Sequence, residues 1–224
     1  MLRKLAMSYS RRARQRRGEM LRSSLDLKPG HKVLDLGGGT GAHFHMIWPD
    51  HENVVVADVS ASDLAEARKR FGYRTVKLDE SDRLPFSDKQ FDFVFCSSVL
   101  EHVTGPKDEM VRLKDTAEFE RRAWNSQEAF AREIERIGKA YWVQTPYRYF
   151  PVDSHSWLPG LIVFLPRPLL VPLLTAFARF WPKKTAPDWN LLTKDQMSRL
   201  FPRARIVAEY SLGMVKSLIA VAFL

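Results

Sequence analysis

The stretch VLDLGGGTGAH, residues 33–43, sets an apolar run directly against three consecutive glycines and a fourth glycine two residues later. An apolar, β-branched run that ends in glycines predicts a buried strand followed by a tight turn. Glycine has no Cβ, so it permits a sharp turn and lets a ligand approach the backbone N–H groups. The stretch therefore predicts a strand at 32–36, a ligand-binding loop, and a helix over 41–48 that Pro49 ends.

The spacing of the glycines narrows the kind of ligand. A dinucleotide site uses G-x-G-x-x-G, in which a helix N-terminus holds a pyrophosphate. Here Gly37, Gly39 and Gly41 follow G-x-G-x-G, and Asp35 lies two residues before the first of them. A carboxylate at that place would repel a pyrophosphate but suits a ligand that carries an ammonium group. Gly38 lies between the matched positions, so we expect it to tolerate alanine best.

Predicted strands and helices alternate along the rest of the chain. Apolar and β-branched runs predict further strands at 53–59, 74–78, 91–96 and 141–145. Helical spacing predicts a helix at 60–71, an insertion helix around 110–123 and another helix just before the strand at 141–145. Strands separated by helices favour right-handed βαβ units and a parallel sheet.

The C-terminal part completes the predicted fold. A helix at 192–201 with Thr193 as its cap precedes strands at 205–209 and 216–221, whose short link requires antiparallel pairing. The sequence thus predicts an α/β fold, with a seven-stranded, mostly parallel sheet, helices on both faces and an antiparallel C-terminal hairpin.

Positive charge is concentrated at the N-terminus. Residues 1–22 hold eight basic side chains against one acidic side chain and so carry +7 of the net charge of +9. We therefore predict a basic helix or arm over 1–27 and a folded domain over 28–224, with an insertion at 105–125. Such a segment could bind phosphates of RNA or anionic lipid. The alternative, a solvated helix or arm, stays open.

Cysteine and histidine usage predicts a metal-free protein of a reducing compartment. Cys96 is the single cysteine, which excludes an internal disulfide framework and a cysteine-cluster metal site. No zinc-ligand spacing occurs, so we expect no metal. The N-terminal arginines are not followed by a signal-peptide apolar run, and we expect a cytoplasmic location.

The segment WLPGLIVFLPRPLLVPLLTAFARFW, residues 157–181, is strongly apolar. A spanning helix needs about 20 uninterrupted apolar residues, whereas four prolines and Arg167 interrupt this run. We predict short helices in an apolar cap over 146–187, which covers the active site or rests on a membrane surface. The alternative is that these residues complete the core or a dimer contact.

Two stretches carry a resemblance to a known family. DLGGGTG, residues 35–41, and KLDESDRLPFSDKQFDFVFCSSVLEHV, residues 77–103, resemble class I S-adenosylmethionine-dependent methyltransferases of the type 11 branch. The resemblance implies a Rossmann-like fold and S-adenosyl-L-methionine as the cofactor. It also implies that the glycine loop lies against the methionine part of the cofactor and that Asp35 helps to hold its amino group.

The resemblance assigns further cofactor residues. Asp58, at the end of the strand at 53–59, would accept both ribose hydroxyls, unless it only favours the dipole of the following helix. Asp79 would contact the adenine amino group, with Glu80 as the alternative. Ser97 and Ser98 would lie beside the cofactor.

The loop TPYRYFPVDSHSW, residues 145–157, is the best source of acceptor-side residues. An oxygen acceptor benefits from a base with a pKa near the working pH, and histidine has one. We predict His155 as this base with Asp153 beside it, and His102 as the alternative base. A structural role for either histidine stays open.

These features predict a methyltransferase whose acceptor is a small molecule or is lipid- or sugar-linked, methylated at oxygen. Peripheral membrane contact through 157–181 and the basic N-terminus would suit a lipid-linked acceptor. One alternative is an RNA methyltransferase that uses the basic arm, although the N/DPPY tetrapeptide of base-modifying enzymes is missing. The other is a non-catalytic, membrane-associated protein that keeps the fold.

Overall fold

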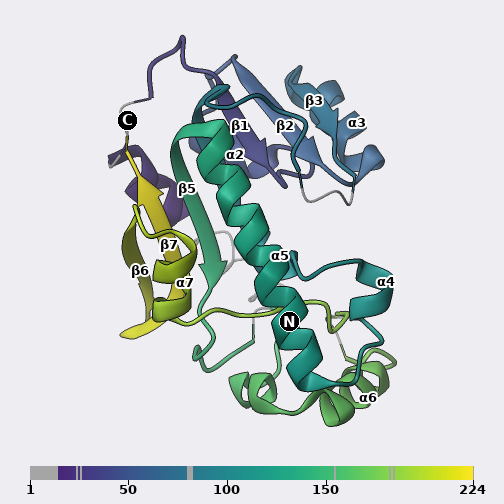
Figure 1. Ribbon diagram of the computed structural model, residues 1–224. Helices are drawn as coiled ribbons and strands as arrows, with labels where there is room; N and C mark the ends of the chain where they lie inside the picture. Colours follow the sequence, from purple (N-terminus) through teal and green to yellow (C-terminus); the bar gives the residue numbers. More distant parts are fainter. Residues whose placement is uncertain are drawn as a thin grey trace. The chain divides into compact units, whose positions relative to one another are not determined.

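The structure, a computed structural model, describes residues 15–23, 25, 27–79, 83–153, 155–181, 183 and 185–223. The chain divides into two compact units. The first comprises Met1–Ser97, Ile134–Val143 and Val221–Leu224, and the second comprises Ser98–Glu133 and Gln144–Ala220. Seven strands form one sheet in the order β3-β2-β1-β4-β5-β7-β6. Figure 1 shows β1, β2 and β3 of the first unit side by side. The predicted α/β fold with a mostly parallel sheet is confirmed.

Four parallel strands form the framework of the first unit: β1 (Val33–Leu36), β2 (Val54–Asp58), β3 (Arg74–Lys77) and β4 (Phe91–Ser97). β1 pairs with β2 and with β4, and β2 pairs with β3, all in parallel. β1 is buried along its whole length, which agrees with its continuous apolar run. Because the strands run parallel, their carboxyl ends meet at one edge of the sheet.

Helices α2 (Ala42–Ile47) and α3 (Ala61–Phe71) follow β1 and β2. α3 begins where the Ser60 side chain accepts a hydrogen bond from the Asp63 N–H, and it ends at Gly72, whose φ of 70° is left-handed. Leu64 and Ala67, three residues apart, are its buried residues. Both helices agree with the predicted ranges.

The described part of the basic N-terminal segment is helical over residues 15–23. Its Leu21 is 1% exposed, and a Cβ added at Gly18 would lie 3.0 Å from the Ile47 side chain of α2. This stretch is therefore packed against the first unit. The predicted arm also includes residues 1–14, 24 and 26, which lie outside the described residues. Binding of RNA or lipid by this segment stays a prediction.

The region before β5 corrects the sequence prediction. The expected insertion helix around 110–123 is wrong: a short α4 (Lys107–Met110) is followed by one continuous helix, α5 (Thr116–Ile137). The Asp115 side chain accepts a hydrogen bond from the Glu118 N–H at 3.0 Å and so caps the start of α5. No glycine or proline interrupts 116–137. The buried side chains of α5 recur at helical spacing at Phe119, Ala123, Gln127, Ala131, Ile134 and Ile137.

The remaining elements belong wholly or partly to the second unit. They are η1 (Leu100–His102), β5 (Gly138–Pro146), η2 (Gly160–Phe164), α6 (Arg167–Phe177), α7 (Lys194–Leu200), β6 (Arg205–Ser211) and β7 (Met214–Ala222). Thr193 caps α7 in a capping box with Gln196, as its position predicted. Leu212 and Gly213, with φ of 51° and 76°, form the tight β6–β7 turn. The predicted antiparallel hairpin is confirmed.

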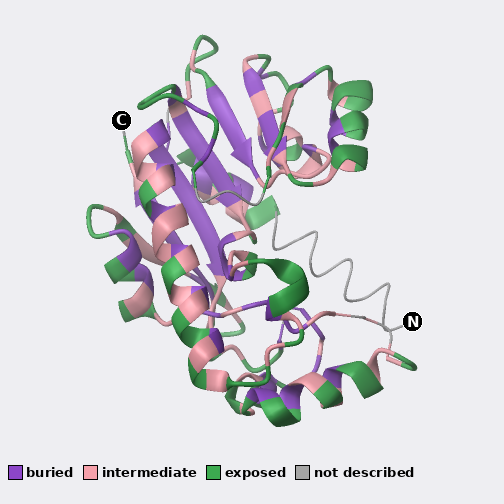
Figure 2. Cartoon of the chain, turned by 45° about the vertical axis from the view of Figure 1, so that its right-hand side comes forward, coloured by how far each residue is buried: buried purple, intermediate pink, exposed green. Residues whose placement is uncertain are grey.

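The apolar segment at 157–181 folds into η2 and α6 and forms a core of its own. Six buried residues make this core, namely Leu158, Ile162, Leu170, Leu174, Trp189 and Leu191. Other apolar residues of the segment are exposed, among them Leu161 and Phe180. Figure 2 colours the chain by burial, with exposed residues in green. In the described ranges no helix is long and apolar enough to cross a membrane. Contact with a membrane surface stays a prediction.

Arg167 connects the start of α6 to neighbouring segments of the second unit through hydrogen bonds and a contact with an aromatic ring. The residue is only 3% exposed. Its Nε, Nη1 and Nη2 atoms donate to the carbonyls of Leu113, Pro187 and Met110 at 2.5, 2.9 and 2.5 Å. Its guanidinium carbon lies 3.6 Å from the centre of the Phe119 ring. One buried cation thus satisfies three carbonyls and covers an aromatic face.

The substitution Arg167→Lys is expected to lower the free energy of unfolding by about 2–4 kcal/mol, because an ammonium group cannot reproduce the planar fork of donors. Burial lowers the pKa of Arg167 to about 10, although the negative charge of Asp188 raises it in part. The side chain is therefore charged at neutral pH. Urea unfolding measures the change. The exposed Arg121, changed to lysine, is the control, and equal losses in both variants would contradict this role.

Candidate functional site

The glycine loop after β1 has the backbone geometry that the sequence predicts. Gly37, Gly39 and Gly41 have φ of 68°, 53° and 71°, a region that side chains with a Cβ rarely adopt. The Gly37 N–H donates to the Ala57 carbonyl at 2.7 Å, which ties the loop to β2. The loop therefore stands at the carboxyl edge of the parallel strands, the usual ligand edge of such a sheet.

Asp35 lies beneath this loop. Its side chain is buried, with 2% of the residue exposed, and among the described residues its Oδ2 atom has no hydrogen-bond partner. Burial, and then the charge of Asp58, raise the pKa of the Asp35 carboxyl to about 7. A buried carboxylate without a partner is costly, and a bound cation would relieve that cost. The site therefore fits a ligand with an ammonium group, such as the amino-acid end of S-adenosylmethionine.

Gly38 corrects a prediction from the sequence. A Cβ added there would overlap Oδ2 of Asp35 and lie 2.7 Å from its Oδ1. The expectation that Gly38 tolerates alanine best is therefore wrong. The reason is a contact within the strand–loop unit: the Asp35 carboxyl occupies the space in which an alanine methyl would have to lie.

The other predicted cofactor residues belong to the same unit. Asp58 accepts hydrogen bonds from the N–H groups of Gly39 and Ser60, each at 2.8 Å, so it holds the loop and the start of α3. Asp79 is exposed just after β3, and Ser97 is half-buried at the end of β4. Their contacts with the ribose and adenine stay predictions. The alternative Glu80 lies outside the described residues.

The second unit brings together all three predicted catalytic residues. His155 Nδ1 lies 3.2 Å from Asp153 Oδ1. The rings of His102 and His155 meet edge to face, with centroids 4.9 Å apart and an interplanar angle of 81°. Asp153 and His155 are 2% and 9% exposed, whereas the side chain of His102 is 39% exposed. The geometry therefore brings these three residues into one cluster.

Glu101 completes this cluster, although the sequence did not single it out. The residue is fully buried. Its Oε2 accepts a hydrogen bond from Thr145 Oγ1 at 3.0 Å, and its Oε1 lies 3.7 Å from His155 Nε2. His102 has a carboxylate neighbour as well, since its Nδ1 lies 3.6 Å from Asp188 Oδ1. The EH pair in VLEHV was the available signal for Glu101, but nothing in the sequence pointed to Asp188.

The two carboxylates around His155 set its charge. Burial alone would lower the pKa of His155, but the hydrogen bond with Asp153 and the charges of Glu101 and Asp153 raise it to about 9. Burial raises the pKa of Asp153, yet the hydrogen bond and the charge of His155 outweigh this and hold it below its usual value. Without a ligand, His155 is therefore protonated at neutral pH. Its role as a base needs the neutral ring and stays a prediction.

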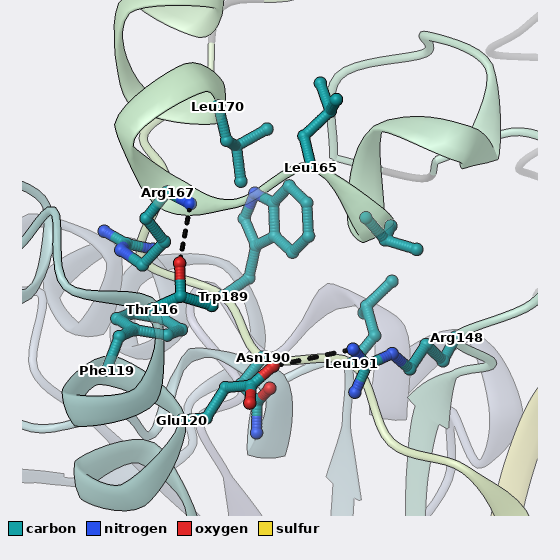
Figure 3. A pocket seen from close by; sticks show the side chains of 11 residues that line it. Thr116, Phe119, Glu120, Arg148, Leu165, Arg167, Leu170, Trp189, Asn190 and Leu191 are labelled. Carbon is teal, nitrogen blue, oxygen red and sulfur yellow. Dashed lines mark hydrogen bonds and ion pairs between the residues drawn. The ribbon is translucent and has the colours of Figure 1, made fainter.

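A small cavity lies on the apolar side of the second unit (Figure 3). Its volume is about 40 Å³, and Trp189 lines it together with Leu165, Leu170 and the Arg148–Glu120 ion pair. The Trp189 ring also stacks on His155, with centroids 5.3 Å apart and planes 13° apart. The volume suits about one water molecule.

Comparison with known proteins defines the class. Residues 33–114 match the family model described as a methyltransferase domain. This stretch contains the glycine loop, Asp58 and the LPF…EH region, and the strand order matches the methyltransferase fold. Residues 33–114 therefore match a methyltransferase domain, in agreement with the resemblance to class I S-adenosylmethionine-dependent methyltransferases.

Curated relatives give more particular likenesses. The ubiquinone/menaquinone biosynthesis C-methyltransferase of Vibrio campbellii is 37% identical over 94 residues, which cover 38% of this chain and 36% of that protein. The demethylmenaquinone methyltransferase of Beutenbergia cavernae is 36% identical over 81 residues, covering 36% and 34%. The match thus spans about a third of the length of these relatives.

Solved structures extend the likeness of the fold over most of the chain. An S-adenosylmethionine-dependent methyltransferase from Clostridium acetobutylicum superposes with a TM-score of 0.53 at 13% identity, covering 85% of this chain and 82% of that one. A methyltransferase of the same dependence from Aquifex aeolicus gives 0.51 at 15% identity, covering 91% and 87%. At these identities the likeness establishes the fold alone.

Proposed function

We propose that this protein transfers a methyl group from S-adenosylmethionine to a small aromatic acceptor. The observation that carries the proposal is the buried Asp35 carboxylate beneath the glycine loop, with an Oδ2 atom that none of the described residues hydrogen-bonds. When bound, the cofactor supplies a methyl group made electrophilic by the sulfonium. The protein's tasks are then to hold the donor, orient the acceptor and exclude water.

Different residues of the first unit are proposed to bind different parts of the methyl donor, S-adenosylmethionine. Asp35 would pair with the amino group, and the bare backbone of Gly37 and Gly39 would let the methionine part approach. Asp58, already engaged with two backbone N–H groups, keeps the loop in shape and offers its remaining lone pairs to the ribose hydroxyls. Asp79 and Ser97 stand at the same strand edge for the adenine.

For the acceptor, we propose a hydroxylated aromatic ring with an apolar substituent, such as a quinol. The relatives are named as quinone-pathway methyltransferases, and the Vibrio protein as a C-methyltransferase, so their names favour carbon over the oxygen expected from the sequence. The exposed apolar side chains between 157 and 181 supply a surface on which such a substituent can lie. An acceptor linked to a sugar has no comparable support.

Incubation with isotopically labelled S-adenosylmethionine tests this proposal. The protein is supplied with a demethylated quinol in detergent, and separately with a cell extract, and mass spectrometry then locates the label. We expect labelled product in the apolar fraction with the methyl on a ring carbon. Asp35→Asn should lose this activity, whereas Asp50→Asn, at an exposed carboxylate of the first unit, should keep it.

If the label is found elsewhere, a different activity would be assigned to the protein. A label on phenolic oxygen would restore the original expectation of O-methylation. A label confined to RNA would support the nucleic-acid alternative. Cofactor binding without product from any acceptor would contradict the proposed activity and favour a binding protein that keeps the fold.

A further inference from the structure

We infer that Glu101, His102 and His155 form a binding site for a divalent transition-metal ion of the zinc type. One ligand atom from each of the three side chains can be chosen so that all of them lie within 4.8 Å of one another. Two of these residues are adjacent in η1 and the third comes from the loop after β5, so the sequence showed no ligand spacing and predicted no metal. The fold of the second unit creates the arrangement.

Glu101 provides the strongest sign that a cation belongs here. The residue is fully buried, and its Oε1 atom has no hydrogen-bond partner within the part of the chain that the structure describes. His155 Nε2 lies 3.7 Å from this oxygen. Thr145 fixes the other oxygen, Oε2, so Oε1 is held toward the two imidazoles. A fully buried carboxylate oxygen left in this state is costly, and a metal ion would remove that cost.

Both imidazoles are oriented by a second carboxylate, as metal-binding histidines usually are. Asp153 Oδ1 lies 3.2 Å from Nδ1 of His155, and Asp188 Oδ1 lies 3.6 Å from Nδ1 of His102. Each of these contacts uses Nδ1, and Nε2 of His155 faces Oε1 of Glu101 at 3.7 Å. Trp189, stacked on the His155 ring, limits its rotation. The cluster therefore has both the ligands and the outer carboxylates of a metal centre.

The donor set indicates the class of ion. Two imidazole nitrogens and one carboxylate oxygen suit zinc and its neighbours in the first transition row. In a tetrahedral zinc site with bonds of about 2.1 Å, ligand atoms stand about 3.4 Å apart, so an ion would draw the present groups together. Three protein ligands leave a fourth position open, and His102, with 39% of its side chain exposed, borders solvent. An oxygen of the acceptor could occupy that position. This role of the ion rests on the proposed function, whereas the binding of the ion does not depend on it.

Titration of the full-length, chelator-treated protein with Co²⁺ alone tests the site. Cobalt in a tetrahedral nitrogen–oxygen site gives strong visible absorption, and calorimetry with Zn²⁺ measures affinity. We expect about one ion per chain. His102→Ala and Glu101→Gln should weaken binding by at least about 100-fold, and Asp188→Asn, at a neighbour of His102 that is not itself a ligand, by about 10–100-fold. His31→Ala, in the first unit, should leave binding unchanged.

The outcomes separate the possibilities. Absence of the cobalt spectrum in the wild-type protein would overturn the inference and leave His155 as a protonated partner of two carboxylates. Equal affinity in the wild type and His102→Ala would overturn it as well, by showing adventitious binding. If Glu101→Gln does not fold, the half-exposed His102→Ala and Asp188→Asn variants still decide. Because neither methyl donor nor acceptor is present, failure of the proposed methyl transfer would not affect this result.

Discussion

Replacement of Asp35 by asparagine is expected to weaken the binding of S-adenosylmethionine at about pH 8 by at least tenfold, and to stabilise the cofactor-free protein. The first effect follows because asparagine has the shape of aspartate but no charge to pair with the ammonium group. The second follows because the wild-type protein must bury a carboxylate at this pH without a hydrogen bond to Oδ2 from any described residue. One substitution should therefore move function and stability in opposite directions.

The pH dependence of this effect has a definite sign. In the folded protein Asp35 keeps its proton up to about pH 7, whereas in the unfolded chain the carboxyl loses it near its ordinary pKa of 3.8. Between these values the unfolded state binds fewer protons, so the Asp35 contribution to stability falls as the pH rises. The full penalty, about 4 kcal/mol for three pKa units, is present above about pH 7 and absent below about pH 4.

Urea unfolding of the cofactor-free proteins at about pH 4, 6 and 8 measures this contribution. Asp35→Asn should be more stable than the wild type at the highest pH and similar to it at the lowest. Calorimetry should show that the wild type gains cofactor affinity as the pH rises towards about 7, whereas the variant does not. The exposed Asp50→Asn is the control. A variant that binds the cofactor as tightly as the wild type at high pH would remove Asp35 from the donor site.

Gly38→Ala is expected to cost about 2–4 kcal/mol of stability and to abolish measurable cofactor binding. Its Cβ would overlap the Asp35 carboxyl. Asp35 has a short side chain, is 2% exposed and belongs to the fully buried strand β1, so the carboxyl has little room to move. Unfolding experiments and cofactor titration measure the two losses. At Gly30, by contrast, an added Cβ meets no heavy atom of the described residues within 4 Å, so Gly30→Ala should be nearly neutral.

A double-mutant cycle distinguishes this overlap from a general intolerance of the loop. In an Asp35→Ala background the carboxyl is gone, so Gly38→Ala should then cost much less stability than it does in the wild type. If the cost is the same in both backgrounds, backbone geometry at Gly38 rather than its contact with Asp35 is responsible.

The sequence predicted most strands and the glycine loop because their signals are local. The apolar run of β1 and the glycines after it fix a strand end and a turn within a dozen residues. The β6–β7 hairpin was equally accessible, since a short link leaves only one way for the strands to pair. α5 was divided wrongly because its charged surface residues concealed the stripe that includes Phe119 and Ala123.

The site was only partly predictable, for a physical reason. The sequence suggested that Gly38 could be replaced by alanine. The spacing of the glycines does not reveal that the Asp35 side chain points into the space that the alanine methyl would need. The second-unit cluster depends on contacts over long sequence separations: Asp188 stands beside His102, and Trp189 stacks on His155. Neither periodicity nor a motif predicts such long-range contacts, because they form only when the chain has folded.

The hydrogen bonds that Asp58 accepts have a kinetic consequence. Because Gly39 is already in its left-handed conformation and anchored to β2 through Asp58, the loop has its shape before any ligand arrives. A ligand then loses no free energy to ordering the loop, and affinity benefits from this preorganisation. Association with the first unit should accordingly proceed as a single encounter step whose rate rises linearly with ligand concentration, with no slower rearrangement limiting it.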